Sequence, residues 1–193
     1  MSTKPSGFDF TFHMRRLSSD MTARLGELRH VDMSQVAIAF SQTRHGGRYG
    51  VYASLTPLRF AGGQSKTVRR GRTWTIPRLL QNGREMLYIL TFYLPRFLDL
   101  PLGEKLVTVT HELWHISPQF DGDLRRYRGR CYAHSGSKRS YDARARQLAA
   151  DWLSREPARE LYDFLDTDFR GLLARFGPVY GQRIRAPKLR PED

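Results

Sequence analysis

Cysteine is almost missing from this 193-residue chain, and long hydrophobic runs are missing altogether. Cys131 is the single cysteine, so no disulfide can form within the chain, and a reducing, cytoplasmic setting is the default expectation. The densest apolar stretch, 86–102, is interrupted by prolines and charged residues and falls short of the roughly 18 residues that a transmembrane helix needs. The segment MSTKPSGFDF lacks a basic start followed by an apolar region, so we expect neither a signal peptide nor a membrane partner.

Acidic residues are scarce relative to basic ones, with 19 Asp and Glu against 32 Lys and Arg and a net charge of +13. A field of this sign attracts polyanions, which makes nucleic acid a candidate partner. Two arginine clusters stand out: Arg69, Arg70 and Arg72; and Arg125, Arg126, Arg128 and Arg130, followed by Lys138, Arg139, Arg144 and Arg146. Tyr127 and Tyr132 in the second cluster are able to stack on bases. The alternative is a solvated loop partly paired with Asp121, Asp123 and Asp142.

The periodicity of apolar residues predicts an α+β domain, with strands first and helices afterwards. The expected elements are a helix from Asp9 to His30, strands at Val36–Phe40, Tyr49–Phe60, Thr67–Ile76 (turning or bulging at Gly71) and Met86–Tyr93, a helix ending near Ile116 before Pro118, and helices at Ser140–Ser154 and Ala158–Phe176. We expect a mainly antiparallel sheet. The predicted boundaries are a flexible leader at 1–7, one domain at 8–182 and an irregular basic tail at 183–193.

The motif with the clearest chemistry is His-Glu-Leu-Trp-His at 111–115. Residues four apart lie on one helix face, one turn apart, so His111 and His115 can present imidazole nitrogens to one ion. Zn2+ suits such a site, because it binds imidazole, lowers the pKa of water and polarises carbonyl groups. Glu112, beside the first histidine, is then placed to accept the proton of that water. Two satisfied structural histidines are the alternative interpretation.

A catalytic zinc site has three protein ligands, and the segment after the motif offers several candidates for the third. His134 is the first choice, because imidazole is a common ligand and the Gly-containing loop can carry it back to the helix. Asp142, at the start of the next helix, is the second choice. Asp121 has the spacing of the third metzincin ligand, but Pro118 stands where that group has glycine. Cys131 is better interpreted as a small buried residue.

The remaining candidates are weaker. We interpret His13, His30 and His45 as surface or helix-capping residues. An oxyanion formed during hydrolysis needs a hydrogen-bond donor, and several residues near the proposed third ligand have one. These are Tyr127, Tyr132, Tyr141 and Arg130, among which the sequence does not choose.

The stretch from LYILTFYLPRFL through EKLVTVTHELWHISPQFDGDLRRYRGRCYAHSGSKRSYDA resembles a metallopeptidase family of bacteria and phages with the zincin-like fold. The resemblance extends over most of the chain and is strongest at HELWHISPQFDGDLRR. It implies zinc ligands at His111 and His115, a catalytic Glu112 and, as third ligand, His134. Phage-type members have His-Asp after the loop, whereas this chain has His134-Ser135. The resemblance does not supply a substrate.

We therefore expect a zincin-like domain with an N-terminal helix, a metal-binding helix and C-terminal helices, acting as a zinc metallopeptidase on a protein or peptide substrate. The alternative from another class is a basic nucleic-acid-binding protein whose zinc site is structural or inactive. A site with three protein ligands and access for water favours the first, and a closed site with four ligands favours the second.

Overall fold

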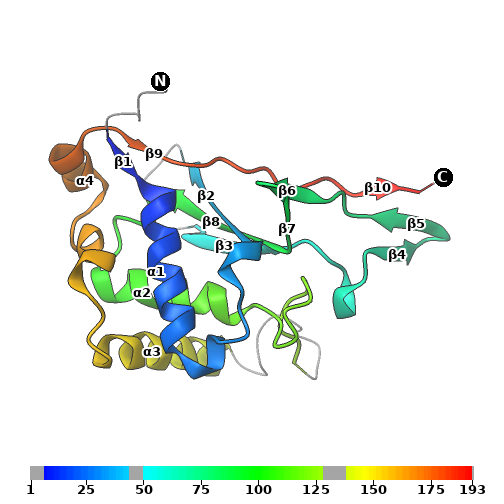
Figure 1. Ribbon diagram of the computed structural model, residues 1–193, viewed down its shortest axis with the longest axis horizontal. Helices are drawn as coiled ribbons and strands as arrows, with labels where there is room; N and C mark the ends of the chain where they lie inside the picture. Colours follow the sequence, from blue (N-terminus) through cyan, green and yellow to red (C-terminus); the bar gives the residue numbers. More distant parts are fainter. Residues whose placement is uncertain (1–6, 44–49, 128–137, 193) are drawn as a thin grey trace.

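A computed structural model of the protein describes residues 7–43, 50–127 and 138–192. These residues form a mixture of helices and small sheets, which confirms the predicted α+β class (Figure 1). The α-helices are α1 (Phe10–Arg24), α2 (Leu102–Trp114), α3 (Lys138–Ser154) and α4 (Phe169–Phe176). The strands are β1 (Phe8–Asp9), β2 (Val36–Gln42), β3 (Ala53–Pro57), β4 (Lys66–Arg69), β5 (Arg72–Thr75), β6 (Leu79–Gln81), β7 (Arg84–Met86), β8 (Tyr88–Leu94), β9 (Val179–Tyr180) and β10 (Arg190–Pro191). Within these residues, every helix is too short or too polar to cross a bilayer.

The first helix begins and ends at positions set by local chemistry. The carboxylate of Asp9 accepts a hydrogen bond from the Phe12 amide at 3.0 Å and so caps the N-terminus of α1. The helix was predicted to reach His30, but it ends at Arg24. Leu25 is extended and Gly26 begins a short 3₁₀ segment, in keeping with the low helix propensity of glycine.

The central sheet has three strands in the order β2-β8-β3. β3 runs antiparallel to β8, whereas β2 runs parallel to β8. The predicted antiparallel character therefore holds for most strand pairs, but β2–β8 in the central sheet and β1–β9 are parallel. The chain passes through β3 to β7 between β2 and β8, and it returns to the same end of the sheet before β8 begins.

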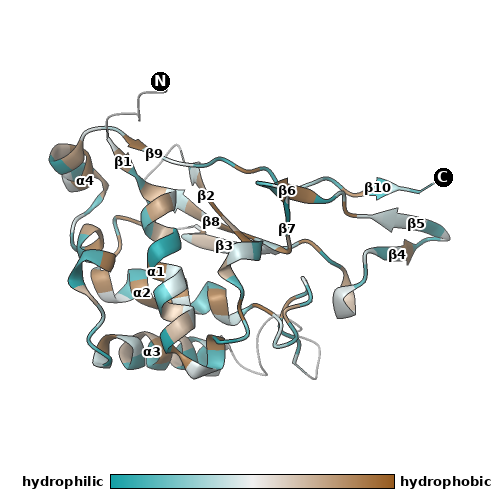
Figure 2. Cartoon of the chain, in the orientation of Figure 1, coloured by the Kyte–Doolittle hydropathy of each residue, from teal (hydrophilic) through white to brown (hydrophobic). Residues whose placement is uncertain are grey.

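Alternate residues of the central sheet face opposite sides, and each side has its own core. The larger core joins the sheet to α1, α2 and α3, and the residues that the central sheet contributes to it are Val36, Ile38, Phe40, Ala53, Tyr88, Leu90, Phe92 and Leu94. The smaller core on the other side consists of Ala37, Ala39, Leu58, Met86 and Ile89. Leu79 of the β6–β7 hairpin packs against it. Figure 2 shows hydrophobic and hydrophilic residues alternating around α1 and α3, as expected for helices with one buried side.

A second, smaller sheet has the order β10-β5-β4 and lies at the end of the molecule opposite α4 (Figure 1). We call β4, β5, their connecting turn and β10 the basic arm. Arg70 and Gly71, both with positive φ, make the turn at the position predicted for Gly71. The tail at 183–193 was predicted to be irregular. That prediction was wrong for Arg190–Pro191, which pairs with β5.

Two other segments differ from their predictions. The β6–β7 hairpin was missed, although Asn82-Gly83, with φ values of 49° and 76°, is a strong signal for a two-residue turn. The helix predicted over Ala158–Phe176 is divided into 3₁₀ segments at Arg159–Leu161 and Asp163–Asp166, followed by α4. The break occurs because Asp168 caps a new helix, its carboxylate accepting from the Gly171 amide at 2.7 Å.

Candidate metal centre

The two histidines of the motif lie together at the C-terminal end of α2. His111 is in the helix, and His115 follows its last residue but keeps helical backbone angles. The apolar residues Leu106, Val109 and Leu113 hold the opposite side of α2 in the larger core. The Nε2 atoms of His111 and His115 are 3.2 Å apart. Two nitrogen ligands on one tetrahedral zinc ion are separated by about 3.3 Å, so this pair fits a shared metal ion.

Asp142 lies on the other side of the His111 ring. Its Oδ1 atom is 3.4 Å from His111 Nδ1, whereas the Nε2 atom of the same ring faces His115. This position suits a carboxylate that holds a ligand histidine in one orientation and leaves Nε2 to bind metal. Asp142, the second choice for the third ligand, therefore lies beside Nδ1 of His111 and not beside the two Nε2 atoms.

Tyr141, which precedes Asp142 at the start of α3, contacts the rings of both histidines. Its ring stacks on that of His115, with centroids 4.8 Å apart and planes inclined by 25°, and it meets His111 edge-on. Its hydroxyl donates to the His111 carbonyl oxygen at 3.4 Å. Burial raises the pKa of Tyr141. This residue was considered as an oxyanion donor, but its hydroxyl is directed at the backbone of α2.

Glu112 occupies a buried position between α2 and the sheet. Burial raises the pKa of its carboxyl group to about 7, and a hydrogen bond from the Leu55 backbone in β3 opposes the shift. The carboxylate therefore lies against the edge strand of the central sheet, next in sequence to the first histidine. Among the residues described, β3 has β8 as its only partner strand, and its other edge is the one that faces Glu112.

A cleft of about 530 Å³ opens beside these residues. Its walls come from the residues leading into β3 and from one side of α2 and α3. They include Tyr52, Val107, His111, Glu112, Asp142 and Arg146. The volume lies within the range of roughly 300–1,000 Å³ that is usual for ligand sites. One histidine and the glutamate of the motif are thus accessible from a cleft that is bordered by a strand edge.

The segment that follows α2 is fixed by a buried carboxylate, Asp123. It accepts hydrogen bonds from the amides of Gly62 at 2.9 Å and Leu124 at 2.8 Å, and from Arg126 Nε at 2.6 Å. Burial alone would raise the pKa of Asp123, but these hydrogen bonds, led by that of Arg126, hold it below its usual value. The Tyr88 hydroxyl donates to the Asp123 carbonyl oxygen at 2.9 Å. The chain after the motif is therefore tied both to the sheet and to the loop that precedes the basic arm.

The described arginines of the second cluster are mostly engaged within the protein. Arg125 lies over the Trp114 ring at 3.7 Å and donates to its carbonyl oxygen at 2.8 Å. Arg126 pairs with Asp123, as one interpretation of the sequence expected. Arg144 pairs with Glu27, and Arg146 with Glu104. Arg126, Arg144 and Arg146 thus each have an acidic partner, whereas Arg139 is exposed and Arg128 and Arg130 lie outside the described residues.

The remaining site predictions are placed as follows. His134, together with Cys131, Tyr132, Arg128 and Arg130, lies outside the described residues. Asp121 accepts a hydrogen bond from the Asp123 amide at 3.1 Å and so stabilises the turn after α2. Within the part of the chain that the structure covers, no three His, Cys, Asp or Glu residues gather as a metal site. Two of the proposed ligands and the proposed base are thus brought together, and the third ligand stays a prediction.

Two supporting contacts were not anticipated from the sequence. One is the hydrogen bond from the Leu55 backbone to Glu112, and the other is the hydroxyl of Thr110, which donates to the Ala145 carbonyl oxygen at 2.9 Å and joins α2 to α3. Both depend on residues far apart in the chain, and no local pattern signals them. Comparisons with protein-family models, curated proteins and solved structures gave no significant match.

Proposed function

We propose that the chain is a zinc-dependent metallopeptidase that hydrolyses peptide bonds with Glu112 as general base. The observation that supports this most is the 3.2 Å separation of the two Nε2 atoms, with a buried glutamate next to the first of them. Zinc bound there would supply an activated water and polarise the scissile carbonyl group. The resemblance to a zincin-like metallopeptidase family points to the same chemistry.

His111 and His115 would hold the ion through Nε2, and His134 is the third ligand that we propose. Asp142 would keep a proton on Nδ1 of His111, so that Nε2 carries the lone pair. Tyr141 would hold the His115 ring by stacking on its face. The chain would thus supply two nitrogen ligands, Nε2 of His111 and of His115, whose orientation depends on Asp142 and Tyr141 of α3.

Glu112 would take a proton from water on its carboxylate and deliver it to the leaving amine. Its surroundings suit this role, since burial brings the pKa of its carboxyl group to about 7, near the pH at which a base must both gain and lose a proton.

A peptide is the substrate class that the cleft favours. The cleft reaches β3 at its first residue, Ala53, and the edge of β3 turned away from β8 has no partner strand among the described residues. An extended peptide can add to such an edge through main-chain hydrogen bonds. This arrangement would bring successive peptide groups past Glu112. An isolated amide would gain nothing from the strand edge.

The test is the variant Glu112→Gln in the full chain, with zinc content, melting temperature and cleavage of a proteome-derived peptide library as readouts. We expect about one zinc per chain and an unchanged melting temperature, whereas cleavage falls by roughly 10²–10⁴-fold because the base is lost. Glu160→Gln is the matched control, since it makes the same chemical change at an exposed residue outside the cleft. Loss of zinc from Glu112→Gln would make the glutamate a ligand or support. Zinc-dependent cleavage at the wild-type rate would refute the mechanism. Absence of zinc from the wild type would mean that His111 and His115 form a structural hydrogen bond and no metal site.

A further inference from the structure

The basic arm presents arginines that the rest of the protein leaves unneutralised. Among the described residues, no carboxylate lies within ion-pair distance of Arg69, Arg70 or Arg72, and all three side chains are exposed. The second arginine cluster differs, since Arg126, Arg144 and Arg146 have acidic partners. All three arginines of the first cluster therefore carry positive charge without an acidic partner among the described residues.

The strand register collects these charges on one face of the arm. Arg69 lies directly opposite Arg72, and Thr67 opposite Trp74. Because side chains alternate along a strand, Arg69, Arg72 and Trp74 share a face. Leu189 joins that face from the segment leading into β10. Like charges placed directly opposite each other destabilise a strand pair, so folding alone does not explain this arrangement.

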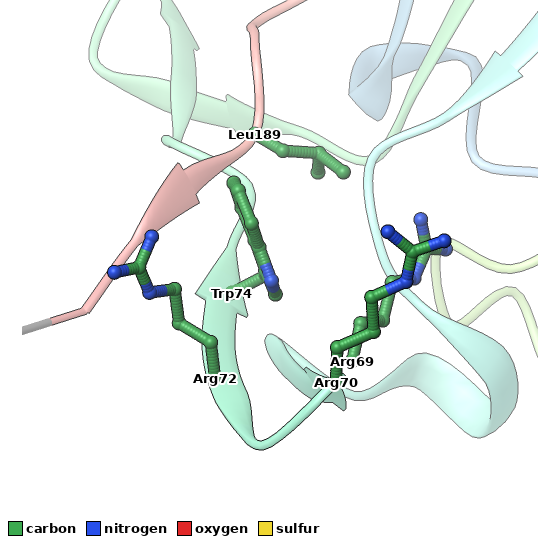
Figure 3. A pocket seen from close by; sticks show the side chains of 5 residues that line it. All are labelled: Arg69, Arg70, Arg72, Trp74 and Leu189. Carbon is green, nitrogen blue, oxygen red and sulfur yellow. The ribbon is translucent and has the colours of Figure 1, made fainter.

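An indole lies between the guanidinium groups. Figure 3 shows Trp74 between Arg72 on one side and Arg69 and Arg70 on the other, with Leu189 above it. These five residues line a cleft of about 530 Å³. No residue from 64 to 77 is buried, so Trp74 is not held there by a core. The arm therefore combines an accessible aromatic surface with cations on both sides of it.

We propose that this face of the basic arm binds single-stranded nucleic acid, with a base stacked on Trp74 and phosphates paired with Arg69, Arg70 and Arg72. Guanidinium groups bind phosphate through paired hydrogen bonds, and aromatic side chains bind bases with little sequence preference. A duplex would satisfy the arginines but keeps its bases stacked inside, so it would leave Trp74 unused. This site is independent of the zinc motif and of the proposed peptidase activity.

The site is also firmly connected to the body of the protein. The loop that precedes β4 is tied to the segment after α2, because the Gly62 amide donates to Asp123 and the Arg59 amide donates to the Gly122 carbonyl oxygen at 3.0 Å. Within the arm, β10 pairs with β5, and Lys66 of β4 pairs with Glu192 at 2.7 Å, so the three strands form one unit. A bound strand would therefore be held at a fixed place on the molecule.

The first experiment measures fluorescence anisotropy of a labelled 12-nucleotide oligothymidine and of a 12-base-pair duplex with the full chain at several salt concentrations. We expect tighter binding of the single strand. In the triple variant R69Q/R70Q/R72Q the slope of log affinity against log salt should shrink by about 2, since each lost phosphate contact removes roughly 0.7. The matched control R29Q/R155Q/R170Q removes the same charge from exposed positions elsewhere and should keep the wild-type slope.

The second experiment isolates the stacking. Trp74→Leu should weaken binding of the single strand by about 5- to 150-fold without changing the salt slope, and Trp74→Phe should restore most of it. Circular dichroism checks that each variant is folded. Tighter binding of the duplex, an equal loss in the control triple variant, or no effect of Trp74→Leu would each overturn the proposal. Binding to phosphatidylserine vesicles without binding to the oligonucleotide would overturn it in favour of a membrane surface.

Discussion

The basic arm and the rest of the protein, which we call the body, differ in how far their side chains are buried. In the body, α1, α2 and α3 bury one face of the sheet, and buried polar groups such as Asp123 and Thr110 have hydrogen-bond partners. The arm has no buried residue from 64 to 77 and is held by strand pairing and by one ion pair. Side chains in the body are therefore constrained by packing. Those of the arm are not, which makes a tryptophan among arginines there more informative about binding.

The largest expected contrast lies in the contribution of two tryptophans to stability. Trp152 is fully buried, and its Nε1 donates to Asp20 at 2.8 Å. Trp152→Ala should lower the free energy of unfolding by about 3–5 kcal/mol through the cavity that it leaves. Trp74→Ala should change it by less than about 1 kcal/mol, because that ring is only partly covered. Urea denaturation measures both, and equal losses would show that the arm is part of the cooperative core.

The second contrast concerns zinc. Asp142→Ala should weaken zinc binding by about 10–100-fold, since the carboxylate orients His111 from outside the ligand shell. His111→Ala and His134→Ala should weaken it far more, because each removes a proposed ligand. The arm variant R69Q/R70Q/R72Q should leave the zinc affinity unchanged. Competition with a fluorescent zinc chelator measures all four. A larger loss in Asp142→Ala than in His134→Ala would transfer the role of third ligand to Asp142.

The sequence predicted those parts of the fold whose signals are local. Apolar periodicity located β2, β3, β8, α2 and α3, and glycine located the turn of the arm. The pairing of β10 with β5 escaped prediction, because a two-residue strand has no periodicity and gains its hydrogen bonds from a partner more than a hundred residues away. The broken helix before α4 escaped it for a different reason. Its apolar spacing continues across the break, while Asp168 starts a new helix by capping it.

The same division holds for the candidate site. The pair His111 and His115 follows from a four-residue spacing on a helix, which is a local rule. The positions of Asp142 beside Nδ1 of His111, of Tyr141 beneath His115 and of Leu55 against Glu112 arise where α3 and β3 pack against α2. Such contacts depend on tertiary packing, which residue spacing does not encode. Whether an arginine has an acidic partner likewise depends on the fold, as with Arg144 and Glu27, which are far apart in the chain.

The smallest expected effect concerns a charge inside the body. Lys105 is 2% exposed, and its Nζ donates to the carbonyl oxygens of Leu165 at 2.7 Å and Thr167 at 2.8 Å. Burial lowers the pKa of this amine to about 8, against the opposing influence of Asp168 and Asp99. Above pH 8 the folded chain loses this proton, while the unfolded chain keeps it until about pH 10.4. The unfolded state then binds more protons, so the contribution of Lys105 to stability rises with pH in this window.

Lys105→Met isolates this contribution, because it keeps the length of the side chain and removes the titrating group. The free energy of unfolding of the wild type minus that of Lys105→Met should rise by on the order of 1 kcal/mol between pH 8 and pH 9.5. The window stops there because the unfolded chain begins to lose the Lys105 proton as the pH approaches about 10.4, so the difference levels off above it. Urea denaturation at four pH values gives the difference. A flat or falling difference would mean that Lys105 keeps its proton throughout, held by the two carbonyl groups, and that the body accommodates this charge without loss of stability.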